Sequence, residues 1–411
     1  MAINKFIYNY FLVLFAIIPI SIIAGPFISL SNILIIDLSF ICLIIYLKNY
    51  NFLKSKSFKY LVALYVYLIF NSFTSIDSSE GIYRNLGFIR IILLFVAINF
   101  FFNQNLFFKK VFWAWLIIIS AVVLDIYLER ISGKNFLGFG EQYGERIVSF
   151  FKDEPIVGGY VNSFYLIIIG FLFDNYKNYN QRKILLLSLI VIVAIFVTGE
   201  RTNSIKAFLG ISIFYFFLKD LTLKKKIIFL TTILIFISII ISNSNFLKLR
   251  YVDQIKYSKI ENSLYYRHYK SGISVFKNNK FLGVGNKNYR IETCGNFDER
   301  KKLNNQNYLC STHPHQTYFE FLSEHGIFGT IFLLFIFYKL IFSKIKETHI
   351  RGNYIQKGCL IYLTLLFLPL LPTGSFFNDY MITLFAINLS IFYGSNDKLN
   401  VFSIKKKYKY I

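Results

Sequence analysis

A long series of apolar stretches constrains this chain more than any other feature of its sequence. Each stretch approaches the roughly 20 residues that an α-helix needs to cross a bilayer. The first begins just after Lys5, but it lacks a convincing small-x-small cleavage site and a second stretch follows at once, so it is interpreted as a helix and not as a signal peptide. Twelve candidate spans are predicted: residues 7–24, 29–47, 59–73, 86–102, 110–128, 156–173, 184–198, 203–218, 226–242, 316–342, 357–371 and 377–394.

The composition supports a chain that lies mostly in lipid. Hydrophobic residues make up 55% of the sequence and charged residues only 16%, whereas a soluble domain carries about 25% charged residues. The net charge of +23 could indicate nucleic-acid binding, but the basic residues gather in alternate connections between spans, so no nucleic-acid partner is expected. The predicted fold class is an all-α integral membrane protein with about 12 transmembrane helices in the lipid bilayer.

The basic residues also predict the orientation of the chain. Even-numbered connections include "LKNYNFLKSKSFK", "NYKNYNQRK" and "SKIKETHIRGNYIQK", and the C-terminal "IKKKYKYI" resembles them. Odd-numbered connections such as "AGPF" and "TGERTNS" carry at most one Lys or Arg. Because cytoplasmic loops are enriched in Lys and Arg, both termini are predicted to lie in the cytoplasm.

Two outward-facing segments are longer than a connection needs to be: residues 129–155 and residues 243–315. The second has about 70 residues, so it is predicted to form a small folded domain. The chain is therefore divided into residues 1–242 with the first nine transmembrane helices, residues 243–315 as a loop domain, and residues 316–411 with the last three helices and a cytoplasmic tail.

Cysteines and histidines in the loop domain raise the alternatives of a metal site and a disulfide. Cys310, His313 and His315 form a C-x2-H-x-H pattern, to which Cys294 could add a fourth ligand. That pattern matches no common zinc spacing, and imidazoles two residues apart on an extended chain point apart. A disulfide between Cys294 and Cys310 is predicted on the oxidising side of the membrane, with two free thiols as the alternative. No metal is expected.

Proton transfer is the better chemical role for the stretch "STHPHQTYFEFLSEHG" at residues 311–326. It contains three of the five histidines of the chain, directly before an apolar run. A neutral imidazole with a pKa near 6.5 is a competent base at ambient pH. Glu324 and His325 are expected at a helix surface or at the interface.

Two arginines are candidates for binding phosphate on the same outer face. Arg201 lies in the tight turn "TGERTNS" beside Glu200, where it could bind lipid headgroups or cap a helix, or grip a phosphate with two parallel hydrogen bonds. Arg267 lies in "SLYYRHYK", which is either a solvated basic face or a second phosphate-binding element opposite Arg201.

A transporter would show different features. Coupled transporters carry intramembrane carboxylates, broken helices and internal repeats. Charges inside the predicted spans of this chain are few, among them Asp37 and Arg90, and a transporter would need these two to face each other along an aqueous path. Polarity concentrated at one membrane face is instead typical of an enzyme that acts on a lipid-linked substrate.

Three sequence patterns together resemble the O-antigen ligase / O-antigen polymerase family. The stretch "HPHQTYFEFLSEHGIFG" is similar to the ligase signature of His, then Asn, Ser or Gln, nine residues, Gly, two residues, and Gly, Thr or Tyr. Here these positions are His315, Gln316, Gly326 and Gly329. The turn "TGERT" and the segment "YYRHYKSGISVFKNNKFLGVGNKNY" are similar to the family's Gly-Glu-Arg-Thr turn and to its loop of Arg, helix and Gly-x-Gly. The resemblance is strongest over about 198–330.

This resemblance implies a GT-C-like glycosyltransferase in the bacterial inner membrane that needs no cofactor. Such an enzyme transfers a glycan from undecaprenyl diphosphate to an acceptor hydroxyl, on lipid A–core in a ligase, at the periplasmic face and with inversion. His315 would be the catalytic base, and Arg201 and Arg267 would stabilise the leaving diphosphate. The implied substrate-binding residues are Arg201, Arg267, His313, Gln316 and Glu200.

The resemblance leaves two alternatives. An O-antigen polymerase, which joins repeat units on the same lipid carrier, would share these residues and would use a glycan as acceptor. A transporter of an anionic solute or lipid is the more remote alternative.

Overall fold

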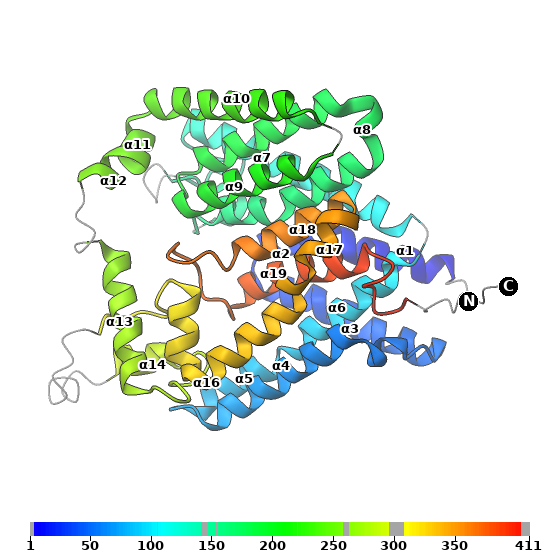
Figure 1. The fold of residues 1–411 in the computed structure, drawn as a ribbon, viewed down its shortest axis with the longest axis vertical. Helices are drawn as coiled ribbons and strands as arrows, with labels where there is room; N and C mark the ends of the chain where they lie inside the picture. The colour runs from blue at the N-terminus through cyan, green and yellow to red at the C-terminus, as the bar shows by residue number, and fades with distance from the viewer. Residues whose placement is uncertain are drawn as a thin grey trace.

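The chain folds into a bundle of α-helices, with no strand among the residues that the structure describes. The computed structural model, shown in Figure 1, describes residues 4–104, 106–140, 146–152, 154–219, 221–257, 263–295 and 308–403. The end of the predicted cytoplasmic tail, from residue 404, lies outside the described residues.

The first part of the chain forms helices that follow the predicted apolar stretches closely. Pro26 stands at the start of α3, where its missing N–H has no cost. The elements are α1 (Lys5–Ala16), α2 (Ile18–Ala24), α3 (Pro26–Leu47), η1 (Asn51–Lys54), α4 (Lys56–Phe73), α5 (Ser78–Leu86), α6 (Ile89–Phe102), α7 (Phe107–Ser132), η3 (Ser149–Phe151), α8 (Val157–Val197), α9 (Arg201–Phe217) and α10 (Leu223–Ser242).

The second part contains the outer segment and the last helices. Short helices make up the outer segment as far as the structure describes it, and α13 packs against α16. The elements are α11 (Asn245–Lys248), η4 (Leu249–Asp253), α12 (Gln254–Tyr257), α13 (Leu264–Asn278), α14 (Tyr289–Cys294), α16 (Thr317–Leu340), η6 (Phe342–Lys344), α17 (Ile345–Arg351), α18 (Tyr354–Leu365) and α19 (Asp379–Gly394).

Local sequence explains where many of these helices begin. A short polar side chain at the N-cap accepts a hydrogen bond from a backbone N–H of the first turn, which otherwise has no partner. This bond is present at Ser55 before α4, Thr222 before α10, Ser263 before α13, Asn353 before α18 and Asn378 before α19.

The predicted count of twelve spans stays a prediction. Each predicted stretch contains helix, and α8 bends at Asn180 so that it supplies two spans. In the described residues, however, seven helices are long and apolar enough to cross a membrane, or up to eight if the bent pair of α1 and α2 is one span. The helices α9, α18 and α19 have only 17, 12 and 16 residues.

The centre of the bundle is formed by α18 and α19. Nearly every residue of these two helices is buried, because α18 packs against α8 and α9 while α19 packs against α6 and α18. A helix that is covered on all sides needs no lipid-facing apolar stripe. By contrast, α10 lies at the periphery of the bundle (Figure 1) and buries little of its surface.

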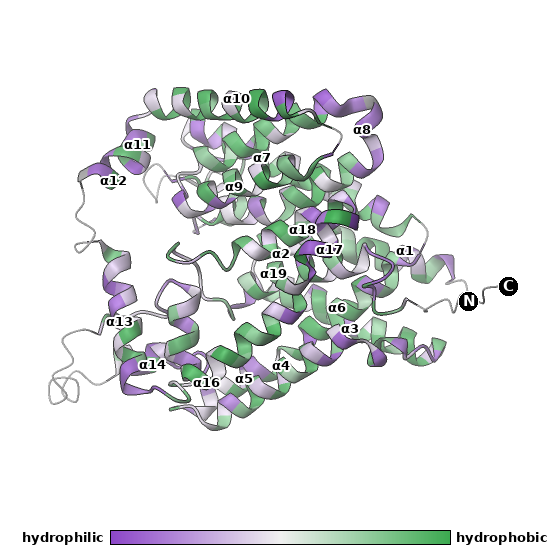
Figure 2. Cartoon of the chain, viewed as in Figure 1, coloured by the Kyte–Doolittle hydropathy of each residue, from purple (hydrophilic) through white to green (hydrophobic). Residues whose placement is uncertain are grey.

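The bundle has two polar ends. The helices α11 to α14 lie at one end, and α1 and the segment after α19 lie at the opposite end (Figure 1). Hydrophilic residues gather in α11 to α14 and, at the other end, around the bend of α8 and α17, whereas the helices between are mostly hydrophobic (Figure 2). The outer segment therefore covers one end of an apolar bundle.

Candidate active site

The turn of residues 313–315, called the histidine turn here, is attached to α16 by a helix cap. The Gln316 side-chain oxygen accepts hydrogen bonds from the backbone N–H groups of Tyr318 (2.8 Å) and Phe319 (3.0 Å), and only 1% of Gln316 is exposed. These N–H groups belong to the first turn of α16 and have no partner within the helix. The Gln316 side-chain oxygen is thus committed to capping the helix, and the contact of Gln316 with the substrate stays a prediction.

A break in α16 explains the glycine of the ligase signature. Gly326 has φ 61° and ψ −170°, which interrupts the helix. The backbone N–H groups of Val284 and Gly285 donate to the carbonyl oxygens of Ser323 and Glu324, both at 2.9 Å, so the loop with the Gly-x-Gly motif satisfies groups that the break leaves free. A Cβ at Gly326 would come within 2.3 Å of this loop's backbone, so only glycine fits.

Glu324 and His325 are buried, which contradicts their predicted place at a helix surface. Neither side chain is exposed, because the loop around Val284 covers this part of α16. His325 Nδ1 lies 3.1 Å from the Tyr67 hydroxyl of α4. The second signature glycine, Gly329, allows the same close approach, since a Cβ there would lie 1.9 Å from the Tyr67 hydroxyl.

Three imidazoles form a cluster at the histidine turn. The ring centroid of His315 lies 4.1 Å from that of His313 and 4.4 Å from that of His268 on α13. Burial, together with the charges of its two neighbours, lowers the pKa of His315 to about 3. Burial and the charge of Lys287 lower the pKa of His313 to about 4, and burial also lowers that of His268. All three rings are therefore neutral at ambient pH.

The two histidines of the turn differ in their hydrogen bonds. The carbonyl of Thr373 can only accept, so His313 Nε2 donates to it (3.3 Å), and Nδ1 then accepts from the Thr312 hydroxyl (2.9 Å). Both nitrogens of His313 are thus engaged. Among the described residues the His315 ring has no such bond. Its backbone is held at φ 55°, and its carbonyl accepts from Thr373 N (2.8 Å). His315 is the ring that is available for substrate.

The loop between α18 and α19 is fixed by a buried charged residue. Glu320 of α16 accepts hydrogen bonds from the Ser375 hydroxyl (2.6 Å) and from the Phe376 N–H. The Lys287 ammonium group donates to the same Ser375 hydroxyl. This network holds the loop, and with it Thr373, against the histidine turn.

Glu200 is also engaged within the protein, and its contact with the substrate stays a prediction. Its carboxylate accepts hydrogen bonds from Gly158 N (2.6 Å), Gly159 N (3.2 Å) and Asn203 Nδ2 (2.6 Å), and only 6% of the residue is exposed. The two glycine N–H groups lie in the first turn of α8, where a negative charge is favourable. Glu200 therefore ties the start of α9, and with it Arg201, to the start of α8.

Arg201 belongs to a cluster of three arginines, two of which the sequence did not indicate. Burial and the positive charges of Arg201 and Arg146 lower the pKa of the Arg250 guanidinium. Arg250 donates to the carbonyl of Gly199 and Arg146 to that of Pro155, both at 3.2 Å. Within the described residues, the Nε atoms of Arg146 and Arg250 are buried without a hydrogen-bond partner. Guanidinium groups this close repel one another, and a bound polyanion would relieve that repulsion.

Tyr265 lies beside both clusters. Its ring centroid is 6.2 Å from that of His315, and its phenol lies near enough to Arg250 to influence the pKa of that guanidinium. Arg267 is exposed on the same helix, and its charge acts on His268. The predicted trio of His315, Arg201 and Arg267 thus lies on neighbouring elements, and no hydrogen bond or ring contact joins its members in the described part of the chain. The sequence feature that could have pointed to Arg146 and Arg250 is their place in the two long outer segments, residues 129–155 and 243–315.

The cysteine pair is not available to a metal. Cys294 and Cys310 form a disulfide with a Cα–Cα distance of 4.6 Å, which links the end of α14 to the histidine turn. Over the described ranges, no group of three or more His, Cys, Asp and Glu side chains is arranged to hold a metal ion.

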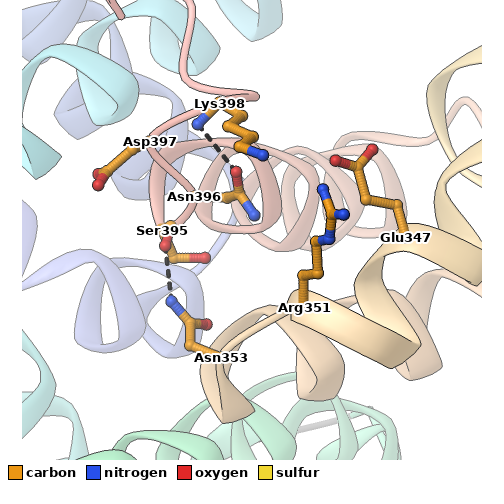
Figure 3. A pocket seen from close by; sticks show the side chains of 7 residues that line it. All are labelled: Glu347, Arg351, Asn353, Ser395, Asn396, Asp397 and Lys398. Atoms are coloured by element: carbon orange, nitrogen blue, oxygen red, sulfur yellow. Dashed lines mark hydrogen bonds between the residues drawn. The ribbon is translucent and has the colours of Figure 1, made fainter.

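The two most evident pockets lie away from these clusters. One, of about 280 Å³, follows the C-terminal ends of α17 and α19, where Arg351 and Glu347 point toward each other (Figure 3). The other is lined by Arg90, which forms an ion pair with Asp379. Asp37 is buried without a hydrogen bond within the described residues. The ion pair of Arg90 is thus with Asp379 and not with Asp37.

Comparison with known proteins supports the family resemblance. The family model described as O-antigen ligase matches residues 186–334, which include the Arg201 turn, α13, the Gly-x-Gly loop, the histidine turn and the break in α16. No curated protein matches the chain. The many apolar helices and this match agree with a membrane protein. The match confirms the resemblance to the O-antigen ligase family over residues 186–334.

Proposed function

We propose that the protein is a membrane glycosyltransferase that transfers a glycan from undecaprenyl diphosphate to an acceptor hydroxyl, with lipid A–core as the acceptor. The observation that supports this function best is a neutral imidazole, His315, near a cluster of three arginines at one polar end of the bundle. A base and a site for a polyanion are the two elements that the reaction requires.

In the proposed reaction, His315 accepts the proton of the acceptor hydroxyl while the oxygen attacks the anomeric carbon. The bond from that carbon to the diphosphate oxygen breaks, and the diphosphate leaves with the electron pair. Attack from the side opposite the diphosphate inverts the configuration. A diphosphate anion near the imidazolium that forms would stabilise the proton on His315.

The arginine cluster would stabilise the charge that grows on the leaving group. Arg201, Arg146 and Arg250 share this role in the proposal, and Arg267 is a further ligand that reaches the diphosphate from α13. His313 acts as a positioning residue, because both of its nitrogens are engaged by threonines. These guanidinium groups supply the positive charge, so the proposed reaction is metal-independent.

We also propose that the site faces the periplasm from the bacterial inner membrane, with both termini in the cytoplasm. The site shares an end of the bundle with α11 to α14, whereas α1 and the segment after α19 lie at the other end (Figure 1). The disulfide beside the histidine turn is typical of an oxidising compartment.

Deletion of the gene and complementation with variants tests this function on lipopolysaccharide gels. Loss of a ligase leaves bare core beside lipid-linked polymer, whereas loss of a polymerase leaves core that carries a single repeat. His315→Ala and Arg201→Ala should fail to complement at normal protein levels. The controls are His349→Ala on α17 and the exposed Arg182→Ala at the bend of α8. Full complementation by His315→Ala would overturn the mechanism.

A further inference from the structure

The first turn of α13 presents an exposed aromatic ring next to the proposed base. Ser263 caps this helix by accepting from Tyr266 N at 3.1 Å, which fixes the turn that carries Tyr265. Tyr265 is 38% exposed although its ring contacts His315 at a centroid distance of 6.2 Å and an interplanar angle of 71°. One part of this ring therefore lies against the imidazole while another part is open to a ligand.

Tyr265 is also close to the other half of the site. Its phenol lies near enough to the Arg250 guanidinium to raise the pKa that Arg201 and Arg146 lower. In the proposed reaction the anomeric carbon must lie between the diphosphate and the acceptor oxygen. If the arginines hold the diphosphate and His315 approaches the acceptor, the first sugar of the donor lies between the two clusters, where Tyr265 stands.

We propose that Tyr265 is the stacking platform for the sugar ring that is joined directly to the donor diphosphate. This inference rests on the proposed function. One face of a pyranose ring presents C–H groups, and an aromatic face carries partial negative charge that attracts them. Positive charge grows on the sugar ring in an oxocarbenium-like transition state, and an aromatic face stabilises a nearby cation. The ring of Tyr265 would thus contribute to binding and, more strongly, to the rate.

Three variants separate the ring from the hydroxyl and from the fold. Tyr265→Phe keeps the ring, Tyr265→Ala removes it, and Tyr266→Ala removes a neighbouring ring that is 41% exposed. Glycan transfer is measured in membranes of the deletion strain that contain each variant and the cell's own lipid-linked glycan. Tyr265→Ala should lower the rate of transfer about 10-fold, while Tyr265→Phe and Tyr266→Ala should stay within about 3-fold of the unaltered protein.

A sugar-free probe completes the test. Farnesyl diphosphate carries the diphosphate and a short polyprenyl chain, so its binding to purified protein should be unchanged in Tyr265→Ala and weakened in Arg201→Ala. The stacking role would be overturned if Tyr265→Ala transferred glycan as fast as the unaltered protein. It would also be overturned if Tyr265→Phe lost as much transfer as Tyr265→Ala, or if Tyr265→Ala no longer bound the probe. Full transfer by His315→Ala would instead overturn the proposed function, which keeps the two failures distinct.

Discussion

Replacement of Gln316 by alanine tests whether this residue acts through the helix or through the substrate. The substitution removes the acceptor of two backbone N–H groups at 2.8 and 3.0 Å in a place where Gln316 is only 1% exposed. Loss of an N-cap costs about 1 to 2 kcal/mol, and a buried donor left without a partner costs about 1 to 3 kcal/mol. A cost of about 2 kcal/mol corresponds to about a 30-fold smaller population of the correctly folded turn.

The assay is glycan transfer in membranes at matched protein levels, compared among three variants. Gln316→Ala should lower transfer about 10- to 30-fold because His315, the next residue back, loses its support. Gln316→Glu keeps an acceptor oxygen and places a negative charge at a helix N-terminus, so it should retain most of the transfer. Gln316→Asn tests a shorter cap. If Gln316→Glu were as damaging as Gln316→Ala, the amide N–H₂ would be the group that matters, and the capping argument would be wrong.

Three further predictions concern the fold around the site. Gly326→Ala should prevent normal accumulation of the protein, because its Cβ would overlap the loop backbone at 2.3 Å, whereas Gly374→Ala, with no atom nearer than 3.4 Å, should accumulate normally on immunoblots. Glu200→Gln should lower the unfolding temperature in detergent, since an amide N–H₂ would replace an acceptor and cost about 1 to 3 kcal/mol; an unchanged temperature would contradict this. The free energy of unfolding should fall as the pH drops from about 6.5 toward 3, because the lowered pKa keeps the His315 ring neutral in the folded state while the unfolded chain binds the proton. Unfolding temperatures at about pH 7, 5.5 and 4.5 check this, and His315→Gln should make the unfolding temperature depend less on pH.

The sequence predicted those parts of the molecule that depend on local pattern. Apolar length predicted the helices, and the motifs predicted the turns that carry Arg201 and His315. A cap could also have been predicted at Gln316, because a polar residue directly before an apolar helix is the usual place for one. The near-complete burial of α18 and α19 was not predicted, because a place at the centre of a bundle is a property of packing and not of one segment.

Contacts between distant segments account for what the sequence did not show. His268 meets His315 across 47 positions, and Arg146 acts on Arg250 across 104 positions. The residue pattern within one segment does not show which distant segment it will contact in the folded chain. The burial of His325 has the same origin, because a loop that lies some 40 residues earlier covers that side of α16.

The two halves of the site have separate anchors. Glu200 holds the Arg201 turn against the start of α8, while Gln316 and Thr373 hold the His315 turn against α16 and the loop before α19. Damage to one anchor should therefore affect one chemical role first: binding of the diphosphate in the arginine half, and proton acceptance in the histidine half.

The Gly-x-Gly loop belongs to neither chemical role. Its backbone pairs with the broken turn of α16, and a Cβ at Gly283 or Gly285 would lie within 2.4 or 2.0 Å of neighbouring atoms. The same loop carries Lys287, whose ammonium group donates to Ser375 in the loop that supports the histidine turn. Packing thus explains the Gly-x-Gly motif. In the proposal, phosphate binding belongs to the arginine cluster, in which the buried Nε atoms of Arg146 and Arg250 have no hydrogen-bond partner in the described part of the chain.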